Sequence, residues 1–143
     1  MLFLWNTENM EMYMICNIVI ELRNICNKYS IDFTPKMKRH LSYIPKSLRC
    51  GIACGTVCSV GNGEDYVGPC INIAARLQKL SNLGLCISKR GIDFEKGMIK
   101  ETAKQYIVKS VSIRGIGEEE LVIVQKVDFE RLPKNEQALF GDV

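Results

Sequence analysis

The sequence predicts an α+β protein in which helices pack on a sheet as a two-layer sandwich. Three observations support this prediction. An amphipathic helical pattern occupies residues 8–28, short apolar runs with strand character follow from residue 48, and a second helical pattern at 71–80 interrupts them. The chain has 143 residues, of which 47% are hydrophobic and 24% charged, so it has the size and composition of one ordinary globular domain.

Charge and cysteine content narrow the possible classes of protein. The formal net charge of +3 is too small to indicate nucleic-acid binding by itself. The seven cysteines are odd in number, and their spacing matches neither a disulfide nor a zinc framework. The apolar start at residues 1–5 is too short for a secretory signal, and no apolar run approaches the length of a membrane span. We therefore expect a cytoplasmic protein with reduced thiols, no membrane span and no nucleic-acid partner.

The first third of the chain is expected to hold one strand, one helix and a loop. Residues 1–5 have the apolar pattern of the end of a buried strand, and Thr7 is expected to cap the helix over 8–28. Pro35 and Pro45 interrupt residues 29–47, which we interpret as a loop with one short helical turn. The basic residues of this loop are expected to be solvated rather than to bind nucleic acid.

The rest of the chain is expected to alternate strands and helices. Strands at 48–53 and 56–60 flank a corner at Gly55, and the Asn62-Gly63 turn leads to a strand at 65–67. The further expected elements are the helix at 71–80, a strand at 84–88, a short helix at 89–96, and a hairpin of 106–114 and 121–127. The domain is expected to span residues 1–128, with a C-terminal tail over 129–143.

The most informative segment joins the strand at 65–67 to the helix at 71–80. Asp65 starts that strand, and Gly68 allows the chain to turn sharply before the helix. Asn72 and Arg76 are four residues apart and therefore project from one face of the helix. The opposite face is apolar and is expected to pack on the sheet.

This segment resembles the catalytic domain of class III adenylate and guanylate cyclases. The resemblance covers residues 48–88, including the strand LRCGIACGTV, the helix with its asparagine and arginine, and the strand LCIS. The hairpin around residues 113–118 matches more loosely. The resemblance implies a ferredoxin-like cyclase fold that is truncated at its N-terminus. It also implies a pocket at a dimer interface, where ATP or GTP is cyclised with release of pyrophosphate.

The resemblance also implies a role for each polar residue. Arg76 matches an arginine that stabilises the charge growing on the phosphate oxygens, and Asn72 matches an asparagine that orients the ribose. Asp65 matches the position that selects the base, where a carboxylate favours ATP over GTP. Arg114 matches a basic residue that contacts phosphates. In isolation such residues are more often a helix cap, a turn former and solvated arginines than functional residues.

Two Mg²⁺ or Mn²⁺ ions are the cofactors that the resemblance implies. Their two aspartate ligands belong to strands of the family that have no counterpart in this sequence, and Asp93 and Glu95 lie on another element. Cys50, Cys54 and Cys58, with His40 nearby, have the spacing of neither a zinc nor an iron–sulfur site, so we interpret these cysteines as core residues. We therefore expect no metal site within this chain.

Two functions remain open from the sequence. The chain is either a nucleotide cyclase that makes cyclic AMP from ATP as a homodimer or heterodimer, or a non-catalytic partner or gene remnant without the metal site. The missing elements would either precede Met1 or come from another chain. Residues 1–143 alone are expected to be inactive, because they lack the two metal-binding carboxylates. They are also expected to be prone to self-association, because the sheet would have open edges.

Overall fold

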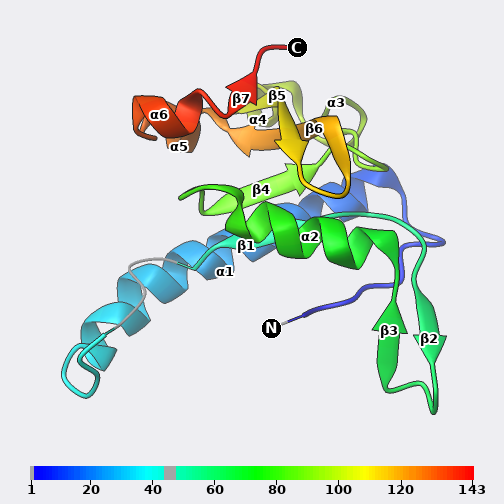
Figure 1. Cartoon of the computed structure of the whole chain (residues 1–143), viewed down its shortest axis with the longest axis horizontal. Coiled ribbons are helices and arrows are strands. Elements are labelled where there is room, and N and C mark those ends of the chain that lie inside the picture. Colours follow the sequence, from blue (N-terminus) through cyan, green and yellow to red (C-terminus); the bar gives the residue numbers. More distant parts are fainter. Residues whose placement is uncertain (1, 44–47) are drawn as a thin grey trace.

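The computed structural model describes residues 2–43 and 48–143, and it contains both helices and a mixed sheet, as expected for an α+β protein (Figure 1). The first half of the chain forms α1 (Met12–Met37), β1 (Cys50–Ile52), β2 (Cys58–Val60), β3 (Asp65–Val67) and α2 (Pro69–Leu80). The second half forms β4 (Leu85–Ser88), α3 (Phe94–Gly97), α4 (Lys100–Ala103), β5 (Tyr106–Ile113), β6 (Gly117–Gln125), α5 (Lys126–Glu130), α6 (Lys134–Gln137) and β7 (Phe140–Gly141).

The main sheet has five strands in the order β1-β4-β6-β5-β7. β1 runs parallel to β4, and the remaining neighbours are antiparallel. The long β5–β6 hairpin therefore forms the centre, and the short strands β1 and β7 form the edges. The expected hairpin of β2 and β3 is also present, but it forms a separate two-stranded sheet. It extends away from the main sheet as an arm (Figure 1).

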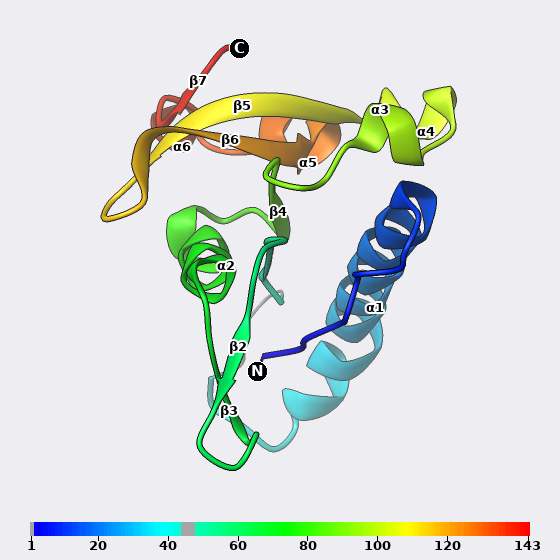
Figure 2. The same ribbon diagram turned by 90° about the vertical axis from the view of Figure 1, so that its right-hand side faces the viewer.

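Helices cover both faces of the main sheet, whereas a two-layer sandwich was expected. On one face, Cys16 and Val19 of α1 pack with Leu85, Ile87 and Ile123. Figure 2 shows α1 on the opposite side of β1 and β4 from α2. All four residues of β4 are buried, because each face of this strand meets a helix.

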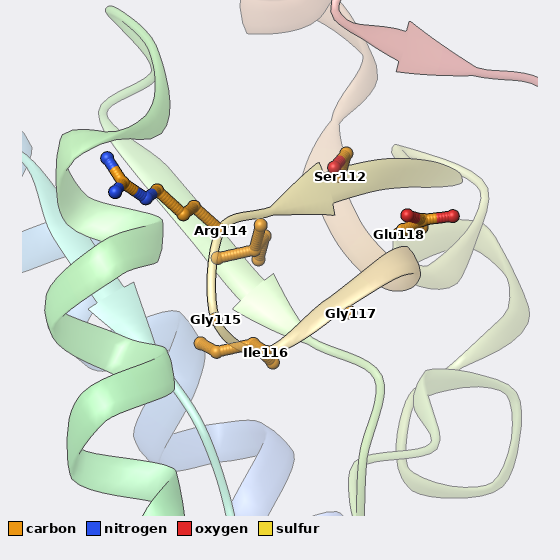
Figure 3. A pocket seen from close by; sticks show the side chains of 7 residues that line it. Ser112, Arg114, Gly115, Ile116, Gly117 and Glu118 are labelled. Carbon is orange, nitrogen blue, oxygen red and sulfur yellow. The ribbon is translucent and has the colours of Figure 1, made fainter.

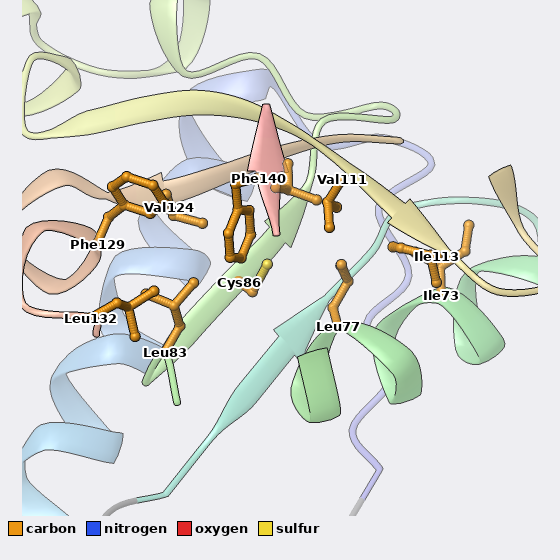
Figure 4. Packing of buried hydrophobic residues seen from close by; sticks show 11 residues of the cluster. Ile73, Leu77, Leu83, Cys86, Val111, Ile113, Val124, Phe129, Leu132 and Phe140 are labelled. Carbon is orange, nitrogen blue, oxygen red and sulfur yellow. The ribbon is translucent and has the colours of Figure 1, made fainter. Parts of the chain in front are cut away.

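The second face of the sheet holds the other core cluster. Ile73 and Leu77 of α2 belong to one buried cluster with Val122 and Val124 of β6 and Phe129 of α5 (Figure 4). Residues 129–143, expected as a tail, add buried Leu132 and Phe140 to this cluster, and β7 pairs with β5. The C-terminal segment is thus part of the packed structure.

The N-terminal expectations were wrong in two respects. Residues 2–5 form no strand, and their side chains are exposed, because no neighbouring strand lies beside them to share backbone hydrogen bonds. The helix begins at Met12, with Glu11 rather than Thr7 at its N-cap. Residue 1 lies outside the described residues.

The loop expected over residues 29–47 was also wrong for its first part, because α1 continues to Met37 with Pro35 inside it. Pro35 has no N–H to donate to the carbonyl of Ile31, but Ile31 is exposed, so water can satisfy that carbonyl. Thr34 O accepts a hydrogen bond from Lys38 N, which closes the last turn. Pro45 and Lys46 lie outside the described residues.

The short helix expected at 89–96 is α3, which begins only at Phe94. Asp93 is its N-cap, and its carboxylate accepts hydrogen bonds from the backbone N–H of Glu95 and Lys96 at 3.0 and 3.3 Å. The preceding residues 90 and 91 form a turn in which Gly91 has a φ of 69°. This left-handed backbone angle prevents the helix from starting earlier.

Candidate functional site

The position of α2 is set by a close approach to β1. A Cβ atom built on Gly51 would lie 2.1 Å from the carbonyl oxygen of Ala74, so no side chain fits between strand and helix. A Cβ on Gly68 would lie 2.4 Å from the carbonyl oxygen of Thr56, so the turn into α2 packs directly on the base of the arm. Two glycines therefore fix both the start and the middle of the helix that carries the candidate residues.

Asn72 and Arg76 lie on the exposed side of α2, one helical turn apart. The buried side of the same helix carries Ile73 and Leu77, which are 4% and 2% exposed. Asn72 lines a hollow of about 460 Å³ together with Gly68 and Pro69 at the helix start, Ile73, Arg90, Gly115 and Ile116. The hollow thus lies between α2, the end of β4 and the turn of the β5–β6 hairpin.

Arg76 reaches the same hairpin turn from the next turn of α2. Its Nη2 atom lies 3.6 Å from the position that a Cβ on Gly115 would occupy. Gly115 has a φ of 76°, which allows the tight turn that brings the hairpin close to α2. Arg114 is exposed at this turn, and Figure 3 shows its side chain extending toward α2. Arg114 and neighbouring residues 112–118 line a second open hollow of about 570 Å³.

Asp65 is not brought to either hollow. It is exposed at the start of β3, opposite Val60, on the side of the arm next to its terminal turn. Gly68 follows it by three residue steps of extended chain, a span of about 10 Å. The structure therefore brings Asn72, Arg76 and Arg114 together around one hairpin turn and places Asp65 outside this group.

An ion pair that the sequence analysis missed borders the first hollow. Arg90 follows β4, and Glu120 belongs to β6. The Nε atom of Arg90 donates to Oε2 of Glu120 at 2.9 Å, and its Nη2 atom donates to Oε1. The Glu120 side chain is 8% exposed, whereas that of Arg90 is 55% exposed.

The strand pattern contains the signal that could have identified this pair. Glu120 alternates with Val122 and Val124, which both face α2 in the buried core. A carboxylate in that register must lie at or near the core and needs a cation beside it. Lys89 and Arg90, which follow the buried strand β4, are basic residues that can neutralise the charge of this carboxylate.

None of the cysteines lines either hollow. Over residues 2–43 and 48–143, no group of three or more histidine, cysteine or acidic side chains could hold a metal ion. All seven cysteines lie in these ranges, and none of them forms a disulfide. Burial, with the Cys26 side chain beside it, raises the pKa of the Cys50 thiol to about 11, and burial raises that of Cys86 to about 12.

Comparisons with known proteins do not identify the chain. No family model, curated protein or solved structure matches it. The geometry above is therefore interpreted from the residues themselves. Within the described part of the chain, no helix combines the length and the apolar character that a membrane crossing requires.

Proposed function

We propose that this chain is a nucleotide cyclase domain that uses Asn72 and Arg76 to convert ATP into 3′,5′-cyclic AMP and pyrophosphate. The observation that supports it is the placement of the two side chains on the exposed face of α2. Asn72 lines the hollow, and Arg76 lies at the hairpin turn that forms its wall. This arrangement resembles the asparagine and arginine pattern of class III cyclases.

Each residue has a distinct part in the proposed reaction. The 3′-hydroxyl loses its proton to water, its oxygen forms a bond to the α-phosphorus, and the bond from that phosphorus to the leaving pyrophosphate breaks, while negative charge grows on the phosphate oxygens. The guanidinium of Arg76 stabilises that charge, since it is fixed on a helix before the reaction begins. The amide of Asn72 holds the ribose so that the 3′-hydroxyl faces the phosphorus. Arg114 supplies a second positive charge at the hairpin turn.

The metal ions of the family do not fit the residues described here. The described ranges contain no group of three or more potential ligands, so no step of the reaction is derived through a metal in this chain. In the proposal, Mg²⁺ or Mn²⁺ is held by a second cyclase chain. The active site then forms between two subunits, and this chain contributes the half that holds Asn72 and Arg76.

A complementation experiment tests the proposal. The full chain is mixed with a class III cyclase that keeps its metal-binding aspartates but has its transition-state arginine substituted, and cyclic AMP is measured with ATP and Mn²⁺. We expect activity in the mixture and not from either protein alone. Arg76→Ala in this chain should lower kcat about 100-fold or more, because it removes charge stabilisation in the transition state.

Lys79→Ala is the matched control, because Lys79 is also a basic residue in the C-terminal half of α2, but Arg76 and not Lys79 lies within 4 Å of the Cβ position on Gly115 at the hairpin turn. It should change kcat less than about twofold, as expected for an exposed charge outside the site. Equal turnover with Arg76 and with its alanine variant would contradict the proposed role. A mixture that makes no cyclic AMP would contradict the proposed function.

The second candidate function is that of a non-catalytic partner of a cyclase chain. The exposure of Asn72 and Arg76 on an open face supports it, because a second chain can cover that face without any nucleotide. The two functions differ in one measurement. A non-catalytic partner would change the activity of an intact cyclase, and Arg76→Ala would not alter that change.

A further inference from the structure

The geometry points to Arg90 as a polyphosphate-binding residue of the hollow that contains Asn72, with Glu120 as the residue that orients it. This inference rests on the proposed function and extends it to a residue outside the motif on α2. The ligand chemistry is a chain of two or three phosphates, either free or as part of a nucleoside triphosphate.

The first argument is the position of Arg90 in the fold. Its backbone N–H donates to the Ser88 hydroxyl at 3.2 Å, and Ser88 is 1% exposed. The backbone of Lys89 donates to the carbonyl of Leu121 at 2.9 Å. The residue that carries the guanidinium is therefore held by the buried end of β4 and by β6, although the side chain itself lies at the surface.

The second argument is the orientation of the guanidinium. Glu120 engages one edge of it, formed by Nε and Nη2. Nη1 makes no hydrogen bond to another described residue, and the side chain is 55% exposed and lines the hollow. The neighbouring edge, formed by Nη1 and the second N–H of Nη2, can bind two phosphate oxygens at once. The ion pair therefore fixes the plane of the guanidinium while leaving a phosphate-binding edge open.

The third argument is the charge around the hollow. Arg76 and Arg114 lie at the hairpin turn, and Gly115 and Ile116 of this turn line the hollow together with Arg90. The Glu120 carboxylate offsets one of these three positive charges, and Glu118, which lines the second hollow with Arg114, offsets another. The remaining positive charge favours an anionic ligand. Asn72 adds an amide, which can donate to a phosphate or to a sugar hydroxyl.

The test measures binding of inorganic tripolyphosphate to the full chain by isothermal titration calorimetry, without any partner protein. The informative variant is Arg90→Gln combined with Glu120→Gln. It leaves the net charge unchanged and leaves no buried carboxylate unpaired, so the fold is kept. We expect it to weaken tripolyphosphate binding about tenfold or more, as for the loss of charge-assisted hydrogen bonds. Arg90→Lys keeps the positive charge but loses the planar set of N–H donors of the guanidinium, and it should weaken tripolyphosphate binding severalfold.

Arg131→Gln is the control, because Arg131 is exposed at the end of α5 and lines neither hollow. It lowers the net charge by one and should change the affinity less than about twofold at physiological salt. Unchanged binding in the double variant, an equal loss in the control, or no binding by the natural chain would overturn the inference.

A parallel titration with ATP separates this inference from the proposed function. Tripolyphosphate binding that depends on Arg90, with no gain in affinity for ATP, would support the phosphate site and contradict the nucleotide function. ATP binding that is insensitive to the double variant would overturn the role of Arg90 and leave the proposed function standing.

Discussion

At the scale of single residues, Gly51 determines how closely α2 lies on the sheet. Replacing it with alanine places a methyl group 2.1 Å from the Ala74 carbonyl oxygen and 2.6 Å from the backbone nitrogen of Gln78. Both atoms belong to the helix backbone and cannot move alone. We expect Gly51→Ala to lower the free energy of unfolding by about 1–3 kcal/mol, as in other overpacked cores. Urea unfolding followed by circular dichroism measures it.

Gly84→Ala provides the control for this substitution. A Cβ on Gly84 would meet its nearest atom, the Leu48 carbonyl oxygen, at 4.0 Å, which is ordinary contact. Its effect on the free energy of unfolding should stay within about 0.5 kcal/mol. Equal stability of the two variants would show that α2 does not depend on the contact with Gly51.

The thiols provide a second prediction at this scale. A raised pKa means that the reactive thiolate forms only at higher pH. Because the pKa of Cys86 is about 12, about one Cys86 thiol in 10,000 is ionised at pH 8. We expect iodoacetamide to modify exposed Cys58 first and Cys86 only after unfolding. For Cys50, with a pKa of about 11, the rate should rise about tenfold per pH unit from 8 to 10.

Peptide mass spectrometry over a pH series measures these rates. Cys58 is the internal reference, because it is exposed on the arm and reacts in the same sample. A Cys86 that reacts in the native protein as fast as Cys58 would show that the face between α2 and the sheet opens.

The candidate site could be predicted from sequence only where its residues are close in the chain. Asn72 and Arg76 are one helical turn apart, so periodicity alone places them on one face. Arg90 and Glu120 are 30 residues apart, and their meeting depends on the pairing of β4 with β6. Asp65 lies away from the hollows because β2 and β3 form a sheet of their own, and the sequence does not show that this sheet is separate from the main one.

At the scale of elements, the C-terminal segment gives the clearest prediction. Phe140 in β7 is 9% exposed and packs edge-on against Phe129, with ring centroids 5.5 Å apart. Phe140→Ala should lower the free energy of unfolding by about 3–5 kcal/mol, because it leaves a cavity in the core face that α2 covers. Chemical unfolding measures this loss.

Leu139→Ala is the matched control, since the neighbouring side chain is 53% exposed. It should change stability by less than about 0.5 kcal/mol. If Phe140→Ala were equally mild, the packing of residues 129–143 would contribute little to the stability of the core.

Helix ends were the least predictable elements, for a physical reason. Residues 29–37 contain Pro35, which normally stops a helix, yet α1 continues because the lost hydrogen bond falls on its exposed side. Stacking of Tyr29 on Phe33, at 4.6 Å between ring centroids, adds a contact within the same turns. The rule that proline ends a helix takes account of neither the exposure of this carbonyl nor the aromatic stacking. The β5–β6 hairpin was predictable because the residues that indicate it, two runs with strand character and the glycines of the turn between them, are close together in the sequence.

At the scale of the whole molecule, the sheet ends in two short edge strands and α1 extends beyond it (Figure 1). Ile25, Tyr29 and Phe33 recur every four residues along this outer part of α1, and Ile25 is 60% exposed. Leu2, Phe3 and Trp5 expose further apolar surface at the N-terminus. A row of exposed apolar side chains such as the one on α1 is typical of surfaces that another chain covers.

We therefore expect the chain to self-associate, with a weight-average mass that rises above 16.2 kDa with concentration in sedimentation equilibrium. Ile25→Lys combined with Phe33→Lys should shift the protein toward the monomer, because each lysine brings a charge that is costly to bury. Ile99→Lys is the control, since Ile99 is 74% exposed on a different element and carries the same change of residue type. A monomer at every concentration, or an equal shift with the control, would show that this stripe of α1 is not a self-association surface.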